Sequence, residues 1–233
     1  MKFLTVKNEA GKRPQLMIYG DIVDDSWNYG WEDDPSVYPK NIKSMLDDLD
    51  GLSEIEVHIN SGGGHVFAGM AICNMLKQFG GKTIAYIDGV AASAASIIAF
   101  GCDEIVIPSN AFLMIHRPAS MVWGTADDMI KCAEMLGVIQ KGAVATYMTK
   151  AVKGVTEEQI NAMINAETWF TGTEAAEFFN VQVTDSVEAL NCTGTVLQHW
   201  SKLPAAFKPK NSADEEVENT IKMKQEIEIA LAL

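Results

Sequence analysis

Short apolar runs bounded by Gly, Pro, Asn or Asp recur along the first half of the chain, and this pattern is typical of strands. It predicts strands over residues 15–20, 54–59, 82–87, 104–108 and 112–116. Apolar residues at helical spacing lie between several of these runs and predict helices over residues 39–50, 66–80 and 93–100. Because strands and helices alternate, we expect an α/β fold with a largely parallel sheet.

Beyond residue 124 the pattern becomes helical. Apolar residues at steps of three or four predict one amphipathic helix of roughly twenty-five residues. They are Met129, Cys132, Leu136, Ile139, Ala143 and Tyr147. Two capping boxes, Thr156 with Gln159 and Thr171 with Glu174, predict the starts of two shorter helices.

One large domain followed by a tail is the expected organisation. A final apolar run, VQVTDSV at residues 181–187, should close the core as a strand. Pro, Lys and acidic residues become frequent after it. We therefore expect a domain over residues 1–190, and a linker with a charged C-terminal extension over residues 191–233.

Charge and hydropathy narrow the class of protein. The chain has 18 basic and 31 acidic residues, a net charge of −13, which disfavours binding to nucleic acid or an anionic membrane. The apolar stretch near the N-terminus is too short for a signal peptide. The most apolar segment, residues 84–100, contains Asp88 and is shorter than the ~20 residues of a spanning helix. We expect a cytoplasmic protein.

The cysteines form no CxxC pair, so the sequence indicates neither a zinc site nor a disulfide framework. They are Cys73, Cys102, Cys132 and Cys192. Buried free thiols are the expected state, and we expect no metal and no cofactor.

A glycine run, INSGGGHVF at residues 59–67, lies between a predicted strand and a predicted helix. The dinucleotide fingerprint GxGxxG fails because Phe67 stands where its last glycine is needed. A P-loop at Gly81-Lys82-Thr83 fails as well, because Leu76 replaces its first glycine. Glycines still let backbone N–H groups approach a ligand closely, and an oxyanion hole needs that property.

Two serines lie in the small-residue segment DGVAASAASIIAF, residues 88–100. Ser93 opens a predicted helix, where its hydroxyl can be exposed and the N–H of Ala94 can face developing negative charge. Ser96 lies one turn deeper, which suits packing. From position alone, Ser93 is either a nucleophile or a simple N-cap.

A nucleophilic serine needs a base, and His116 ends a predicted strand. Ligands bind at the carboxyl ends of strands in open α/β sheets, although an isolated histidine is more often structural. His58 and His199 are interpreted as structural, and His65 as a residue that can line a cleft.

Four motifs in order, INSGGGHVFAGMAI, DGVAASAASIIA, MIHRP and ETWFTGTEAAE, resemble the Clp protease proteolytic subunit (ClpP) family of serine peptidases across residues 15–186. The repeated AAS, the MIH strand end and the tryptophan after the acid most resemble the subgroup of phage and prophage head maturation proteases. The resemblance implies a ClpP/crotonase-like spiral of repeated β-β-α units with a protruding long helix.

The resemblance makes Ser93 the nucleophile and His116 the general base. It makes the backbone N–H groups of Gly64 and Ala94 the oxyanion hole. The implied activity is a serine endopeptidase that works through an acyl-enzyme. Gly62 replaces the proline of the family's NSPGG motif, which should make the loop less rigid.

The third member of the triad departs from the family's usual aspartate. The matching position is Glu167, whose extra methylene requires a different backbone distance. Glu167 is the expected residue. A solvated acid at a helix end is the alternative, with Asp103, Asp127 or Asp185 as a substitute.

The family resemblance also implies partners. It implies a homo-oligomeric ring, commonly a heptamer stacked on a second ring through the helix at residues 125–150. The substrate would be a protein or peptide. A separate ATPase would deliver it in classical members, whereas phage-like members are expected to process scaffold or capsid precursors.

An acidic, aromatic segment at residues 20–38 is interpreted as a solvated loop, or else as a binding surface. Its anchors would be Trp27, Tyr29, Trp31 and Tyr38. Two other functions stay open: a catalytically silent assembly protein of the same fold, and an acyl-CoA enzyme of the crotonase type. The co-occurrence of Ser93 and His116 disfavours the second.

Overall fold

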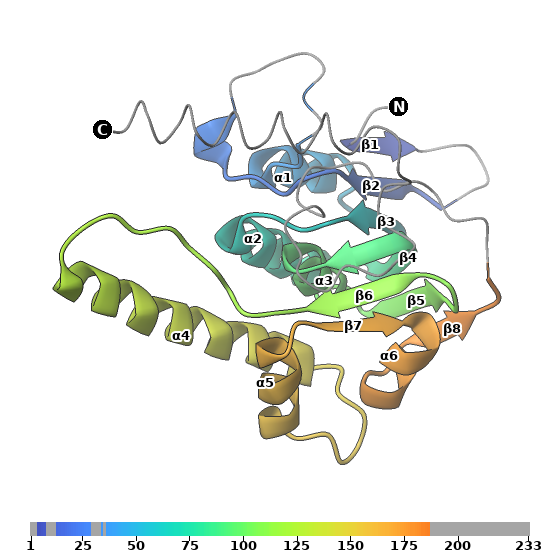
Figure 1. Ribbon diagram of the computed structural model, residues 1–233. Helices are drawn as coiled ribbons and strands as arrows, with labels where there is room; N and C mark the ends of the chain where they lie inside the picture. Colours follow the sequence, from blue (N-terminus) through green and yellow to red (C-terminus); the bar gives the residue numbers. More distant parts are fainter. Residues whose placement is uncertain (1–3, 8–12, 29–33, 35, 187–233) are drawn as a thin grey trace, which may run out of the picture. The chain divides into compact units, whose positions relative to one another are not determined.

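The computed structural model describes residues 4–7, 13–28, 34 and 36–186 (Figure 1). Its strands are β1 (Leu4–Lys7), β2 (Gln15–Tyr19), β3 (Glu54–Ser61), β4 (Lys82–Ala92), β5 (Glu104–Pro108), β6 (Phe112–Ile115), β7 (Thr168–Thr171) and β8 (Gln182–Thr184). Its helices are η1 (Asp25–Trp27), α1 (Pro39–Asp48), α2 (Val66–Lys77), α3 (Ala94–Ala99), α4 (Ala126–Met148), α5 (Glu157–Asn165) and α6 (Gly172–Phe178). The expected C-terminal extension, Tyr29, Trp31, Cys192 and His199 lie outside the described residues.

One mixed sheet organises the described chain. Its main path runs β1-β2-β3-β4-β5-β8, and every pair on it is parallel except β1 with β2. The end of β4 pairs with β6 in parallel, and β6 pairs with β7 antiparallel. The predicted α/β class and largely parallel sheet are confirmed.

One face of the sheet carries the hydrophobic core. Ile55, Val57 and Ile59 alternate along β3 and are fully buried. They belong to the same apolar cluster as Ile42 of α1 and Ile72 of α2. Burying each such side chain contributes about 1.5–3 kcal/mol, so this layer fixes the helices against the sheet.

Several elements differ from the sequence-based expectation. Strands β1 and β7 were not predicted. The expected strand at residues 181–187 is wrong as a closure of the core, because β8 has only three residues, all exposed, and pairs with β5 at the sheet edge. Both predicted capping boxes are confirmed, at the starts of α5 and α6.

Two side chains in the described chain correct earlier interpretations. Tyr38 is only 4% exposed, so it belongs to the core and is not a surface anchor, whereas Trp27 is exposed. Cys73 and Cys102 are buried free thiols, as predicted, but Cys132 on α4 is half-buried.

The long helix α4 is confirmed but is only partly covered. In Figure 1 it extends well beyond α2 and α3. Only its C-terminal end, with Ala143, Val144 and Tyr147, is buried. The apolar side chains exposed on α4 are Met129, Ile130, Met135 and Val138, and those exposed just before it are Met121, Val122 and Trp123. None of the helices formed by the described residues is long and apolar enough to cross a membrane.

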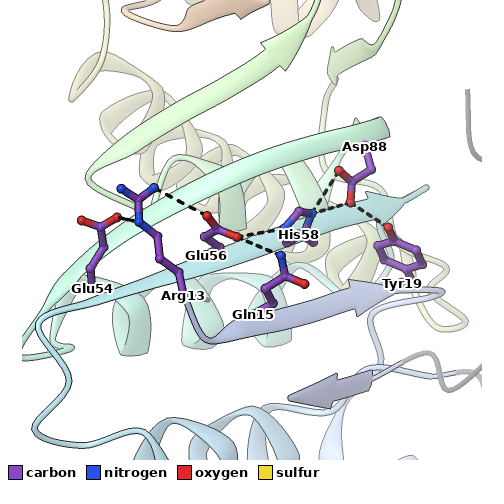
Figure 2. A network of polar contacts seen from close by, with 7 residues as sticks. All are labelled: Arg13, Gln15, Tyr19, Glu54, Glu56, His58 and Asp88. Atoms are coloured by element: carbon purple, nitrogen blue, oxygen red, sulfur yellow. Dashed lines mark hydrogen bonds and ion pairs between the residues drawn. The ribbon is translucent and has the colours of Figure 1, made fainter. Parts of the chain in front are cut away.

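The other face of the sheet carries a polar network across β2, β3 and β4 (Figure 2). Asp88 accepts a hydrogen bond from the Tyr19 hydroxyl at 2.7 Å. Its carboxylate also lies 2.8 Å from Nδ1 of His58. Glu56 lies 3.6 Å from Nε2 of His58 and accepts a hydrogen bond from Gln15 at 2.9 Å. Burial alone would lower the pKa of His58, but Asp88 and Glu56 outweigh it and raise that pKa above its usual value.

This network predicts a pH-dependent contribution to stability. Because the folded state favours charged His58, its contribution should be complete below about pH 6.5 and should be lost as pH rises through the folded-state pKa. We expect the stability advantage of the wild type over His58→Gln, measured by urea unfolding, to shrink as the pH rises from about 5.5 to about 8.5. Asp88→Asn should weaken this pH dependence, because only Glu56 then favours the charged ring. Parallel pH curves for wild type and His58→Gln would contradict the prediction.

Candidate functional site

Strand register brings three of the predicted site residues together. Ser93 directly follows β4, whose last residue Ala92 pairs with Met114 of β6, and the Ser93 N–H donates to the Met114 carbonyl at 2.9 Å. His116 directly follows β6. In the antiparallel β6–β7 pair, Ile115 lies opposite Thr168, so the next position places Glu167 opposite His116.

Ser93 Oγ lies 2.7 Å from His116 Nε2. This is hydrogen-bond distance, and a neutral imidazole with an unprotonated Nε2 accepts the serine proton. Ser93 occupies the N-cap position of α3, but its side chain makes no capping hydrogen bond. The interpretation of Ser93 as a simple N-cap is therefore wrong.

The environment of His116 keeps its ring neutral. Burial lowers the pKa of His116 to about 4, and the carboxylate of Glu167 partly opposes this effect. Desolvation disfavours the charged ring, while a nearby anion favours it. The ring can consequently accept a proton at neutral pH, and Glu167 would stabilise the charge that results.

The alternative acids lie elsewhere in the described chain. Asp103 accepts hydrogen bonds from the backbone and hydroxyl of Thr83 at the start of β4. Asp127 lies in the first turn of α4, and Asp185 follows β8. Glu167 is the carboxylate whose charge acts on His116.

Two residues of the site have unusual backbone conformations. Ser93 has φ 54° and ψ −122°, and Glu167 has φ 50°. Each such conformation costs about 1–3 kcal/mol in a residue other than glycine and persists only where surrounding contacts enforce it. The bend at Ser93 also requires that Gly63, which lies against it, has no side chain. A Cβ added to Gly63, which has φ 101°, would lie 2.7 Å from the Ser93 Cβ.

The two predicted oxyanion donors belong to peptide units with anchored carbonyls. The Gly63 carbonyl accepts a hydrogen bond from the Ile22 N–H at 2.9 Å, and the Ser93 carbonyl accepts one from the Ser96 N–H at 3.0 Å. A trans peptide unit directs its N–H opposite to its C=O. The N–H groups of Gly64 and Ala94 therefore point away from these anchors. Both belong to segments in contact, because a Cβ on Gly63 would lie 3.1 Å from the Ala94 nitrogen.

The remaining sequence candidates have other roles. Ser96 is fully buried, as predicted for a packing residue. His58 belongs to the polar network on the far face of the sheet. His65 is the N-cap of α2, and its Nδ1 accepts from the Ala68 N–H at 3.4 Å. No cluster of three His, Cys, Asp or Glu side chains in the described part of the chain is arranged to hold a metal ion.

Sequence reasoning missed a cavity of about 420 Å³ beside His116. It lies between the segment after His116 and the middle of α4, and its lining is Arg117, Pro118, Ala119, Ser120, Ala133, Leu136, Gly137 and Gln140. A Cβ added to Gly137 would meet nothing within 4 Å. The one signal in the sequence is that glycine, which interrupts a helical pattern where alanine would be more stable by about 1 kcal/mol.

Comparison with known proteins finds the same family in every search. The model of the Clp protease family matches residues 40–181. ATP-dependent Clp protease proteolytic subunit 2 of Corynebacterium glutamicum is 32% identical over 137 residues, which are 58% of this chain and 67% of that protein. Proteolytic subunit 1 of Mycobacterium leprae is 32% identical over 132 residues, 55% of this chain and 64% of that protein. The chain thus spans about two thirds of the length of these curated relatives.

A solved structure supports the fold. A ClpP1 point mutant from Listeria monocytogenes superposes with a TM-score of 0.60, covering 76% of this chain and 94% of that chain at 22% identity. At this identity the similarity establishes the fold and not the chemistry.

The site predicts that the His116 ring has a pKa well below that of a free histidine. In an NMR titration we expect the ring protons of His116 to report a pKa of about 4. Because the Glu167 carboxylate raises this pKa, Glu167→Gln should lower it further. His116→Gln identifies the resonance. A ring that titrates near 6.5 in the folded protein, or one unaffected by Glu167→Gln, would contradict the described geometry.

Proposed function

Because this chain belongs to the Clp protease family, we propose that it is a serine endopeptidase with Ser93 as nucleophile, His116 as general base and Glu167 as third member of the triad. The observation that carries the proposal is the 2.7 Å contact between Ser93 Oγ and His116 Nε2. The neutral state of His116 and the charge of Glu167 beside it support the same roles.

The reaction would proceed by acyl transfer. Ser93 Oγ attacks the peptide carbonyl while His116 Nε2 takes its proton, and Glu167 stabilises the imidazolium that forms. The carbonyl oxygen becomes an oxyanion and accepts hydrogen bonds from the N–H groups of Gly64 and Ala94. His116 then gives its proton to the leaving amine. Water repeats the sequence on the acyl-enzyme, which releases the acid and restores the Ser93 hydroxyl, so no cofactor takes part.

The substrate would be a peptide segment that lies along α4. The cavity begins one residue after His116, and its volume suits a few residues of peptide. Its walls are mostly apolar, with Arg117 as its charged residue and Ser120 and Gln140 as its other polar side chains. This arrangement supports cleavage of extended polypeptide near the base.

A ring is the proposed assembly. The relatives named above are ATP-dependent proteolytic subunits, and we propose that this chain likewise forms a homo-oligomeric ring that receives substrates from an ATPase or encloses them during assembly. The exposed apolar side chains on the free half of α4 support a second ring as the covering surface.

Processing of phage scaffold or capsid precursors is the finer proposal. It rests on the repeated AAS at Ser93 and Ser96, the MIH strand end and Trp169 after the acid. Cleavage of a co-expressed capsid precursor by the wild type, but not by Ser93→Ala, would test it. The alternatives are less well supported. A crotonase-type enzyme has no need of the Ser93–His116 pair, and a silent assembly protein has no need of a strained serine beside a neutral base.

Covalent labelling tests the proposed activity. We expect a fluorophosphonate to add one label per chain to the wild type, as measured by intact-protein mass spectrometry. Ser93→Ala should abolish the label, and His116→Ala and Glu167→Ala should slow it, because the hydroxyl loses its base or the base loses its partner. Ser109→Ala, in the turn after β5, is the control for a serine outside the site. Unlabelled wild type that is folded and oligomeric would favour the silent assembly protein.

Sedimentation tests whether the exposed apolar face of α4 forms the proposed interface between rings. Val138 and Ile130 are 65% and 57% exposed, and we expect the double change to Glu to convert stacked rings into single rings or smaller species, as measured by sedimentation velocity. Lys153→Glu, an exposed change of charge in the turn after α4, is the control. Unchanged sedimentation of the double variant would show that this face is not an interface.

A further inference from the structure

Two buried hydroxyl groups lie behind the nucleophile. Ser96 Oγ lies 2.6 Å from the Ser93 carbonyl oxygen and 2.8 Å from the Tyr147 hydroxyl. Ser96 is 0% exposed and Tyr147 is 2% exposed. Ser96 is on α3, whereas Tyr147 comes from the buried end of α4.

The direction of these hydrogen bonds follows from the number of protons. A serine hydroxyl has one proton, and Ser96 gives it to the Ser93 carbonyl, which can only accept. The Tyr147 hydroxyl must therefore donate to Ser96 Oγ. Burial raises the pKa of Tyr147, so the phenol keeps this proton. Each bond polarises the next, which strengthens the bond that reaches Ser93.

The Ser93 carbonyl is the group that orients the Ala94 amide. The two belong to one planar trans peptide unit, so a bond that fixes the C=O also fixes the N–H in the opposite direction. The unit is strained, with Ser93 at φ 54°, and needs contacts that enforce it. The backbone N–H groups of Ser96 and Ile97 approach the same oxygen at 3.0 and 3.3 Å, and the Ser96 hydroxyl is closer than either.

Packing holds the far end of this chain of hydroxyls. The Tyr147 ring packs edge-on against Phe100 at a centroid distance of 5.0 Å, and Phe100 packs in the same manner against Phe179 at 4.9 Å. Aromatic pairs in this geometry contribute about 0.5–1.5 kcal/mol beyond the area that they bury. The Tyr147 hydroxyl is thus held by a rigid cluster.

We propose that Ser96 and Tyr147 are positioning residues, which hold the Ser93–Ala94 peptide so that the Ala94 N–H points at the oxyanion. The proposal rests on the proposed peptidase function and assigns no chemical step to either hydroxyl. It extends the interpretation of Ser96 as a packing residue.

The test compares Ser96→Ala and Tyr147→Phe with the wild type. We expect Ser96→Ala to slow fluorophosphonate labelling of Ser93 and to lower kcat for a peptide substrate about tenfold, because a displaced oxyanion donor should cost less than the 10²–10³-fold loss of a deleted one. Tyr147→Phe, which leaves the Ser96 hydroxyl in place, should have a smaller effect in the same direction. KM should not change, since the donor acts on the transition state.

A matched control separates positioning from stability. Thr83 is buried on β4, and its hydroxyl exchanges hydrogen bonds with Asp103 at 3.0 and 3.1 Å, so Thr83→Val also removes a buried hydroxyl. It should lower the unfolding midpoint comparably but leave labelling unchanged. In Ser96→Ala, the affinity for a peptidyl boronic acid, which mimics the tetrahedral intermediate, should fall in proportion to kcat. The affinity for the product peptide should stay constant. Ser96→Thr should restore part of the rate.

Wild-type labelling rates in both Ser96→Ala and Tyr147→Phe would overturn the proposal and leave the peptidase function intact. Equal slowing by Thr83→Val would also overturn it, because the effect would then follow stability. If Ser96→Ala does not fold, Tyr147→Phe with an unchanged rate decides against it. A folded wild type that takes no label refutes the peptidase function itself, and the proposal fails with it.

Discussion

The pairing of β6 with both β4 and β7 is the constraint on which the rest of the site depends. The parallel pair sets Ser93 beside Met114, and the antiparallel pair sets Glu167 opposite His116. Backbone hydrogen bonds therefore determine the relative positions of three side chains that are 23 and 51 residues apart in sequence. Each side chain then only has to adopt the right rotamer. Strands hold catalytic side chains in a more precise geometry than loops do.

The local conformation at Ser93 and its surroundings are mutually dependent. A strained serine is kept in place by donors to its carbonyl, and the absence of a side chain at Gly63 leaves room for the bend. The same dense packing that enforces the strain removes water from His116, which lowers its pKa. Rigidity and a neutral base thus have one physical cause, which is burial at the end of the sheet.

Much of this arrangement could be predicted from the sequence, because it follows from local patterns. Strand ends, capping boxes and the small-residue turn predicted the fold class and placed Ser93 and His116 near strand ends. Pairing between distant segments could not be predicted in this way. Strand β7 carries only four residues, and its identity as a strand depends on β6. The burial of Tyr38 depends on the tertiary fold, since its sequence context is acidic and polar.

The register also determines where the chain can change its length. Side chains alternate between the two faces of a strand, so one residue inserted within β4 or β6 would reverse every side chain after it and turn the serine or the histidine away from the other. The exposed residues 121–125 before α4 have no ladder to preserve and do not line the cavity. Over evolutionary time, insertions and deletions should accumulate in that stretch and be purged from the strands. The spacing between Ser93 and His116 is therefore set by α3, β5, β6 and the turns that join them, while the spacing to Glu167 can change with the length of the segment before α4.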